Sequence, residues 1–450
     1  MIEAAAPSFR EALRFWLKLG FVSFGGPAGQ IAIMHRELVE RRRWISERRF
    51  LHALNYCMLL PGPEAQQLAT YIGWLLHGTR GGIAAGALFV LPSLFILVAL
   101  SWLYVRYGDV PVVNAVLQGI KPAVVAIVLA AAWRIGSRSL RHPLLWAIAA
   151  AAFVALFAFA VPFPLVILGA ALVGAAGGRL VPQAFASAGH AVSGAAHAPA
   201  VIDDDTPTPP HARYDRARFA ATTATFLALW GVALGALVAA FGWRDDFTQM
   251  AWFFTRAALL TFGGAYAVLP YVLQGAVEDH AWITAPQMID GLALGETTPG
   301  PLIMVVAFVG FVGGWAKQLL GADALFAAGA LGATVATFFT FLPSFLFILA
   351  GAPLIERTRG ELGLTAPLTA ITAAVVGVIV NLTVFFAWHV FWPGAVATAP
   401  FATRVDWASV AIAAAASAAL LTRRHEVIPV IGLSALAGLA LWAAGLQGAT

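Results

Sequence analysis

Long apolar runs separated by short polar stretches occupy most of this 450-residue chain. A run of about 20 apolar residues is long enough to cross a bilayer as an α-helix. Such runs lie near residues 11–33, 51–77, 81–105, 112–133, 143–160, 162–178, 219–241, 250–274, 286–316, 322–350, 363–390, 407–421 and 427–446. The pattern predicts an all-α polytopic integral membrane protein with thirteen apolar segments.

The first two apolar runs in each half of the chain are interrupted by glycine and proline. The interruptions are Gly25-Gly26-Pro27, Pro61-Gly62-Pro63, Gly263-Gly264 and Pro299-Gly300-Pro301. Proline removes a backbone donor, and glycine destabilises a helix interior. Unpaired backbone groups survive at membrane depth only inside protein or beside a polar cavity. We therefore predict broken or re-entrant helices that meet at a central site.

The interruptions recur at a constant spacing. Phe24 and Phe262, Trp44 and Trp282, and Pro61 and Pro299 are each 238 residues apart. A repeated pattern of broken apolar segments is typical of transporters built from two related halves. We predict a first repeat over residues 1–178, a flexible cytoplasmic linker over 179–218, and a second repeat over 219–450 with one extra leading helix. The polar linker contains an Asp-Asp-Asp run and a Pro-rich stretch, a composition that favours flexibility.

Charge predicts how the halves sit in the membrane. Loop 34–49 carries six arginines, whereas the equivalent loop 272–287 carries no Lys or Arg. Because positive loops stay in the cytoplasm, the first loop is expected inside and the second outside, so that the repeats are inverted. Composition agrees with a membrane location, since only 11% of residues are charged and the mean hydropathy is +0.83, against about 25% charged in soluble domains.

The four interruptions are the predicted binding site. A helix that starts inside the membrane offers unpaired N–H groups and a partial positive charge, which together bind oxyanions. The residues expected to contact the substrate there are Ser23, Gly25, Gly26, Pro61, Gly62, Pro63, Gln66, Thr261, Gly263, Gly264, Thr298, Pro299, Gly300 and Pro301. Pro63 is expected at the first helical position, and Thr298 is expected either to cap the next half-helix or to donate to a ligand.

Five charged side chains lie within or beside the broken segments. Lys18 and Arg256 match at the 238-residue spacing, and Lys121 lies inside another apolar run. A cation near each break suits an anionic substrate, although the alternative for all three is a position at a helix end near the lipid headgroups. Glu64 and Glu296 do not match each other in the repeat. Either carboxylate is a candidate for coupling transport to protons, and the alternative role is helix capping.

Several ordered motifs resemble those of the chromate ion transporter family. In the first half they are F-W-L-K-L-G-F-V-S-F-G-G-P at 15–27, R-R-R-W-I-S at 41–46, L-P-G-P-E-A-Q-Q-L-A-T-Y-I-G at 60–73 and L-P-S at 91–93. In the second half they are T-F-G-G-A at 261–265, W-I-T at 282–284, P-G-P-L at 299–302 and F-L-P-S at 341–344. The resemblance implies a long-chain, two-repeat member that exports chromate across the inner (plasma) membrane, with sulfate as a mimic of the same shape and charge.

Other function classes remain as alternatives. Export of a dianion from a negative-inside cell can be driven by the membrane potential, with or without a proton gradient. A transporter of sulfate or another small anion is the main alternative, and a channel is a further one. A membrane-embedded enzyme is disfavoured, because the sequence carries neither a phosphate-binding loop nor a cofactor or metal motif, and its one cysteine is Cys57. No nucleic-acid partner is expected, and a homodimer is left open.

Overall fold

The computed structural model describes residues 6–24, 26–185, 199–207, 209–262, 264–357, 365–394, 404–422 and 426–445, and every named element in these ranges is a helix. The first half and the segment that follows it contain α1 (Phe9–Val22), α2 (Gly26–His35), η1 (Arg36–Arg41), α3 (Glu47–Leu59), α4 (Glu64–Tyr107), α5 (Pro111–Ser139), α6 (Pro143–Phe157), α7 (Phe163–Leu180), η2 (Pro182–Ala184) and η3 (Pro210–Ala212).

The second half repeats this order and adds further helices. Its elements are α8 (Arg216–Phe241), α9 (Asp246–Leu260), α10 (Ala265–Leu273), η4 (Gln274–Asp279), α11 (Ala285–Thr297), η5 (Leu302–Met304), α12 (Val305–Ala316), η6 (Ala322–Ala324), α13 (Leu325–Arg357), α14 (Thr365–Phe391), α15 (Trp407–Leu421) and α16 (Val427–Ala443). Helix α8 precedes the repeated elements, in the place where the sequence predicts an extra leading helix.

The 238-residue spacing holds for helix boundaries as well as for sequence motifs. Helices α3 and α11 begin and end at equivalent positions, and so do the π-helices η1 and η4. Ser46 and Thr284 cap α3 and α11 with their hydroxyl groups, since each accepts a hydrogen bond from the third residue of its helix. Arg43 and Ala281, also equivalent, both have positive φ. The two halves therefore share their local backbone conformation.

The halves diverge after the second interruption. In the first half, α4 folds back on itself at His77 and Gly78, where the φ/ψ values are not helical, so that Gly73 lies against Gly81. In the second half, α12 ends at Ala316, the residue equivalent to Gly78, and the chain runs through residues 317–324 before α13 begins. Pro92 and Pro343 of the paired L-P-S motifs are 251 residues apart instead of 238, so the extra residues of the second half lie between Ala316 and Pro343, and α4 corresponds to α12 and α13 together.

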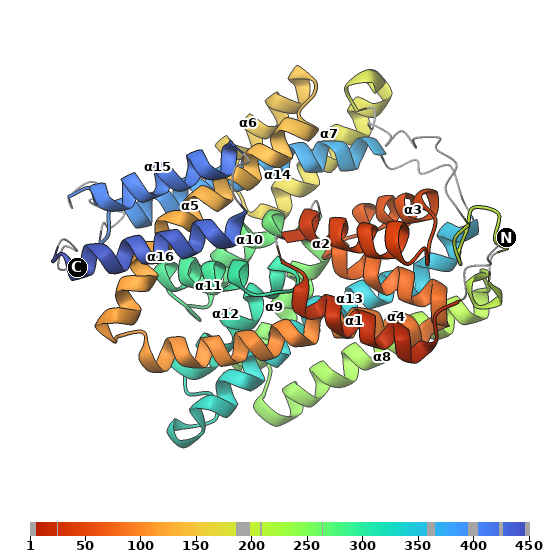
Figure 1. Ribbon diagram of the computed structural model, residues 1–450, viewed down its shortest axis with the longest axis horizontal. Helices are drawn as coiled ribbons and strands as arrows, with labels where there is room; N and C mark the ends of the chain where they lie inside the picture. Colours follow the sequence, from red (N-terminus) through yellow and green to blue (C-terminus); the bar gives the residue numbers. More distant parts are fainter. Residues whose placement is uncertain are drawn as a thin grey trace.

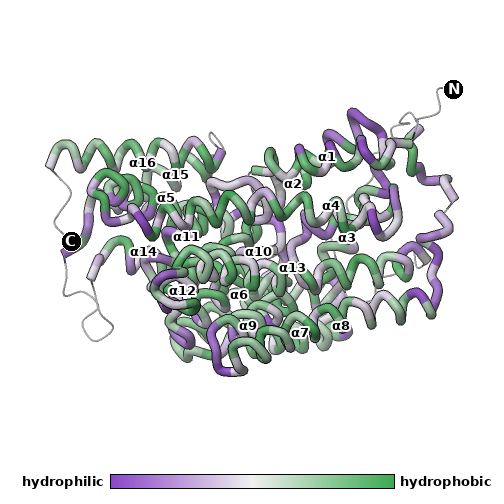
Figure 2. The backbone as a smooth tube through the Cα atoms, turned by 90° about the horizontal axis from the view of Figure 1, so that it is seen from below, coloured by the Kyte–Doolittle hydropathy of each residue, from purple (hydrophilic) through white to green (hydrophobic). Residues whose placement is uncertain are grey.

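The helices are long and apolar enough for a multi-pass membrane protein. Within the part of the chain that the structure describes, six helices have the length and hydropathy of membrane spans. They are α4, α5 and α7 in the first half and α8, α13 and α14 in the second. Shorter apolar stretches cover 143–157, 302–316, 407–421 and 427–443. Figure 2 shows hydrophobic residues along most of the tube and hydrophilic ones gathered mainly at helix ends and loops.

Helices from both halves share one core. Helix α14 of the second half packs against α5, α6 and α7 of the first, while α15 and α16 pack along α5. Figure 1 shows α15 and α16 beside α5, with α9 to α12 in the middle of the molecule. The largest buried cluster accordingly joins residues of α4, α5 and α7 to residues of α9 to α14. The central position of the interruptions follows from this interleaving.

Part of the predicted linker is packed against the first half. Ile202 is 4% exposed and forms an isolated bridge with Ile45. Its carbonyl accepts a hydrogen bond from the Ser46 amide, and the His211 ring bonds to the carbonyl oxygen of Trp74. The polar composition of residues 179–218 did not indicate these contacts. Residues 186–198 lie outside the described ranges.

Candidate functional site

Each half closes one break of the other half. The Gly62 amide donates to the carbonyl oxygen of Thr261 at 2.7 Å, and the Gly300 amide donates to that of Ser23 at 2.9 Å. Gly62 and Gly300 are equivalent in the repeat, and so are Thr261 and Ser23. The two hydrogen bonds are therefore the same contact made twice, with the donor in the first half in one case and in the second half in the other. They also satisfy backbone groups that the breaks would otherwise leave unpaired in the membrane interior.

The glycines at these two positions are required by conformation and by space. The backbone φ angle is +126° at Gly62 and +108° at Gly300, values that residues other than glycine rarely adopt. A Cβ at Gly62 would lie 2.3 Å from Ser344 Oγ, and one at Gly300 would lie 2.7 Å from Ser93 Cβ. Ser93 and Ser344 belong to the paired L-P-S motifs. Each motif thus packs against the Pro-Gly-Pro break of the opposite half.

A third connection between the breaks comes from Gln30, which is 1% exposed. Its side-chain amide donates to the carbonyl oxygen of Gly300 at 2.5 Å and to that of Ser23 at 3.3 Å. The residue at the equivalent position of the second half is Val268, so this contact is not repeated. Sequence reasoning missed Gln30, although a lone amide within the apolar stretch 28–34 was a usable signal.

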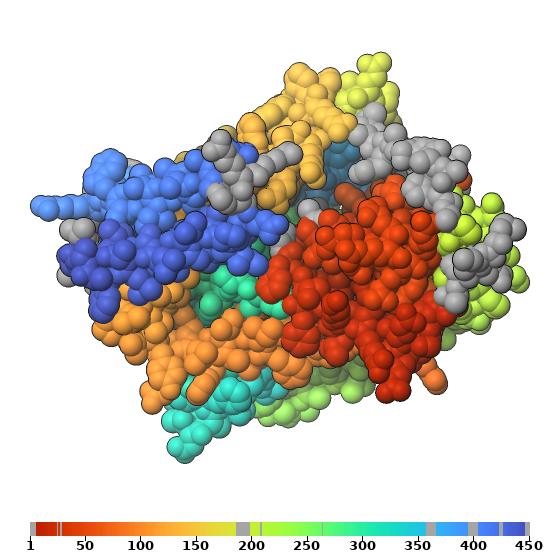
Figure 3. All heavy atoms as spheres, in the orientation of Figure 1, coloured from red at the N-terminus to blue at the C-terminus, as the bar shows by residue number. Residues whose placement is uncertain are grey.

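A cavity lies beside the first break. It is lined by Gly26, Pro27, Arg134, Tyr266, Glu296 and apolar residues of α5, α15 and α16. The Tyr266 hydroxyl donates to Glu296, whose side chain is buried, whereas Arg134 is exposed. Figure 3 shows atoms of the second half in a hollow between the N-terminal helices and α16. The cavity volume is about 20 Å³, close to the space that one water needs.

The two predicted carboxylates occupy comparable places although they do not match in sequence. Glu296 shares the cavity with Gly26 of the first half. Glu64 Oε1 lies 3.9 Å from the position that a Cβ on Gly264 of the second half would take. Each carboxylate therefore lies next to the glycine break of the opposite half. The two pairs, Glu296 with Gly26 and Glu64 with Gly264, together involve all four broken segments.

The predicted cations are placed differently from one another. Lys18 and Arg256 are both exposed, and Arg256 lies over the Trp252 ring at 5.9 Å. Neither lines the cavity at the first break, where the cation is Arg134. Lys121 is 17% exposed, and its Nζ lies 3.6 Å from Asp290 Oδ2. Lys121 is therefore part of an ion pair between the halves.

Several predicted contact residues have structural partners in this conformation. The amides of Gly62 and Gly300 are occupied by protein carbonyls. The Thr298 hydroxyl donates back to carbonyls of α11, so it does not cap the helix that follows. Gln66 donates to the Thr70 hydroxyl. Gly25 and Gly263 lie outside the described residues.

The prolines after the breaks sit one position earlier than expected. Pro63 and Pro301 are the N-caps of the following helices, with extended backbone conformation, and not their first helical residues. Pro61 and Pro299 lie just before the glycines in the same turns. The positive φ of the intervening glycine turns the chain sharply, and this places both prolines outside the helix.

Three charged residues of functional interest were missed in the sequence. Arg134 directly follows the predicted apolar run 112–133, but it belongs to α5 and lines the cavity. Asp290 lies within an apolar run and is 3% exposed, and Glu356 lies just beyond the predicted end of another run and is 6% exposed. A rare carboxylate inside an apolar segment is itself a signal of function, and that signal was available for Asp290.

The chain is similar to known transporters over most of its length. A family model described as chromate transporter matches residues 10–175 and 248–439. A chromate transport protein from Pseudomonas aeruginosa is 33% identical over 86% of this chain and 83% of its own length. One from Cupriavidus metallidurans is 29% identical over 85% and 84%, and a probable chromate transport protein from Synechococcus elongatus is 30% identical over 84% of each chain. No solved structure matches.

Proposed function

Because the chain belongs to the chromate transporter family, we propose that it exports chromate from the cytoplasm across the inner membrane through the cavity beside the first break. The observation that carries this proposal is the grouping of Arg134, Tyr266 and Glu296 with the Gly26 turn in one cavity. A guanidinium presents parallel donors to two oxygens of a tetrahedral oxyanion. Arg134 is therefore the proposed anion-binding cation.

Glu296 is the proposed proton site. In this conformation the cavity has room for about one water, so the anion would bind once the cavity opens. An ionised carboxylate beside a dianion is repelled, so that anion binding favours the protonated carboxyl group. The Tyr266 hydroxyl, which donates to Glu296 in this conformation, is free to turn toward the anion when the carboxyl group takes up a proton. Chromate and one proton would then leave together, with a net charge of about −1 moving down the membrane potential.

The halves are proposed to be inverted in the membrane. Loop 34–49 with its arginines would face the cytoplasm, and the equivalent loop 272–287 would face outward. The exchanged hydrogen bonds of Gly62 and Gly300 are those of a two-fold relation between the halves, and the difference in arginine content between the two loops favours an axis in the membrane plane. The broken helices α1 with α2 and α9 with α10 are the proposed re-entrant segments.

Sulfate is the alternative substrate, since it shares the charge and tetrahedral shape of chromate. The names of three relatives favour chromate. The cavity at Arg134 offers charge and a hydroxyl donor, which either anion can use. Competition between the two anions is therefore expected, and their relative affinity decides the physiological substrate.

Flux in proteoliposomes tests the proposal. Purified protein is reconstituted, the membrane potential and the pH gradient are set independently, and chromate movement is followed with and without sulfate. We expect chromate to follow the potential, to be accelerated by acid on the chromate side, and to be slowed by sulfate. Movement of sulfate with no movement of chromate under any gradient would assign the alternative substrate. Movement that ignores the pH gradient would contradict the role of Glu296.

A further inference from the structure

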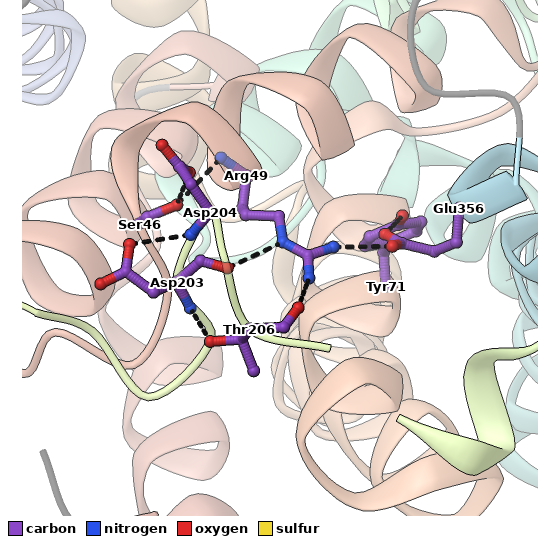
Figure 4. Close-up of polar contacts among 7 residues, drawn as sticks. All are labelled: Ser46, Arg49, Tyr71, Asp203, Asp204, Thr206 and Glu356. Atoms are coloured by element: carbon purple, nitrogen blue, oxygen red, sulfur yellow. Dashed lines mark hydrogen bonds and ion pairs between the residues drawn. The ribbon is translucent and has the colours of Figure 1, made fainter. Parts of the chain in front are cut away.

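A buried ionic cluster joins the two halves at the arginine-rich end of the molecule. Arg49 of α3 is 4% exposed, and its Nη1 donates to Glu356 Oε2 of α13 at 2.7 Å. The Tyr71 hydroxyl of α4 donates to the other oxygen of Glu356 at 2.5 Å. Figure 4 shows these three side chains in contact. The cluster connects α3 and the start of α4, in the first half, to the end of α13 in the second half.

The segment between the halves covers the same arginine. Arg49 Nε donates to the carbonyl oxygen of Asp203 at 3.3 Å, and Nη2 donates to that of Thr206 at 3.1 Å. The Ser46 hydroxyl, one turn from Arg49, donates to Asp204 Oδ1 at 2.6 Å. We call residues 201–206 the strap. Their carbonyl oxygens accept hydrogen bonds from the two guanidinium nitrogens of Arg49 that do not bond to Glu356 (Figure 4).

A second ionic cluster joins the halves in the opposite sense. Asp290 of α11 accepts a hydrogen bond from the Tyr104 hydroxyl of α4 at 2.9 Å and lies 3.6 Å from Lys121 Nζ of α5. Helix α11 is the equivalent of α3, and the part of α4 after its kink is the equivalent of α13. The second cluster therefore connects α11 of the second half to the end of α4 and to α5 of the first half.

The two clusters lie at opposite ends of the long helices. Tyr71 is close to the kink of α4 at His77 and Gly78, whereas Tyr104 is close to the far end of that helix at Tyr107. At a rise of 1.5 Å per residue, the helix between kink and end is about 40 Å long. This length is comparable to the thickness of a membrane, so that the clusters lie near its two faces.

The two clusters differ in how completely they are formed. Arg49 donates from all three of its nitrogens, to a carboxylate and to two carbonyls. In the second cluster the Lys121–Asp290 distance is longer, and the buried Oδ1 of Asp290 has no hydrogen-bond partner among the described residues. The structure therefore holds the first cluster closed and leaves the second partly unsatisfied.

We propose that the two clusters are latches that open alternately during transport, the first between α3 and α13 and the second between α11 and α4. A buried ion pair adds little net stability compared with apolar packing, but it fixes one arrangement of the groups that it joins. Both pairs cross the boundary between the halves, where an alternating-access cycle needs two discrete arrangements. The strap adds a cytoplasmic lock to the first latch. This inference rests on the proposed transport function.

Cys57 provides a native reporter for the first latch. Its side chain lies on α3, is 0% exposed, and packs in a cluster that includes Ile348 and Ile355 of α13. Separation of α3 from α13 would expose it. It is the one cysteine in the chain, so the rate of its reaction with N-ethylmaleimide reports opening at this end.

The test compares Cys57 labelling rates in purified, reconstituted protein without substrate. The double variant Arg49→Gln with Glu356→Gln, which removes both charges and leaves a polar amide at each position, is expected to react about tenfold faster than the wild type. Tyr71→Phe and the strap variant Asp204→Ala are expected to give smaller increases. The control is Glu37→Gln with Arg41→Gln, which removes a surface ion pair within the first half and is expected to leave the rate unchanged.

The second latch gives the decisive comparison. Asp290→Asn weakens the opposite latch, so it should shift the protein toward the closed first latch and slow Cys57 labelling. A variant that merely loosens the fold would accelerate labelling instead. Acceleration by Asp290→Asn, or unchanged labelling in a folded Arg49→Gln/Glu356→Gln protein, would overturn the latch proposal. Labelling needs no anion, so this result is independent of whether chromate is the substrate.

Discussion

Gly300 and Ser23 are joined by a backbone hydrogen bond of 2.9 Å although 277 residues separate them in the chain. The equivalent bond in the other direction links Gly62 to Thr261. Both donors follow a proline, and both acceptors end a helix that stops in the middle of an apolar run. The two breaks in each half are therefore not isolated kinks. They are paired across the molecule, and each half completes the other.

Substitution of Gly300 by alanine is expected to impair folding and transport. The positive φ costs a non-glycine residue about 1–3 kcal/mol, and the added Cβ would meet Ser93 Cβ at 2.7 Å. Thermal unfolding in detergent and chromate flux measure the two effects. Gly169→Ala is the control, because the Cβ there meets open space within a helix, and alanine should be neutral or slightly stabilising. Equal behaviour of the two variants would rule out the proposed constraint at Gly300.

Neutralising Arg134 is expected to weaken anion binding. Arg134→Gln should raise the KM for chromate by about tenfold to a hundredfold, because a charged hydrogen bond to the anion is lost. Arg134→Lys should restore part of the affinity. The exposed Arg138, one turn further along α5, serves as control when changed to Gln. A KM that rises equally in the Arg134→Gln and Arg138→Gln variants would point to a general charge effect and contradict a specific role of Arg134.

The inverted arrangement predicts labelling from opposite sides of the membrane. In a Cys57→Ser background, Ala281→Cys should react with an impermeant maleimide added outside intact cells. Arg48→Cys should react only in inside-out vesicles. Both positions are exposed and lie in the equivalent stretches 34–49 and 272–287, Arg48 in the first turn of α3 and Ala281 just before α11. If both cysteines react from the same side, the halves are parallel and the proposed topology is wrong.

Acid is expected to destabilise loop 272–287 through His280. Burial lowers the pKa of this imidazole, although the nearby carboxylates of Asp279 and Asp246 act in the opposite direction. The imidazole ring of His280 is stacked on the Trp282 ring, with 4.4 Å between the ring centroids. Because the folded state favours the neutral ring, the stability is complete above the unfolded pKa of about 6.5 and declines as the pH falls below it.

The variant His280→Phe keeps a ring for stacking and removes the titrating group. The wild type should lose melting temperature between pH 7 and pH 5 to a greater extent than this variant does. Melting curves of both proteins in detergent, recorded across this pH range, provide the comparison. Parallel curves for the two proteins would show that another group causes the acid sensitivity.

Local chemistry made the breaks and the repeat predictable from sequence. Gly62 and Gly300 stand between prolines in apolar runs, so an interruption at these positions follows from backbone geometry alone. Their hydrogen-bond acceptors could not be predicted, because Thr261 and Ser23 come from the opposite half. Lys121 stands out in the sequence as a cation inside an apolar run, but its partner Asp290 depends on how α5 and α11 pack.

The charged residues show the same limit. Lys18 and Arg256 match in the repeat, yet both are exposed, and the cavity takes its cation from Arg134. Periodicity identifies equivalent positions but does not indicate which face of a helix meets the other half. The contacts of residues 201–206 with Arg49 were likewise missed, since composition describes a segment's preference for water and not its docking partner.

The hydrogen bonds between the halves cannot form until the second half has been synthesised. Gly62 enters the membrane about 200 residues before its acceptor Thr261 is made. At about 5–20 residues per second, the first half exists for about 10–40 s with that amide unmatched. The ribosome therefore delivers a half-finished membrane protein, whose broken helices depend for that time on water, lipid headgroups or an insertion factor until the second half arrives.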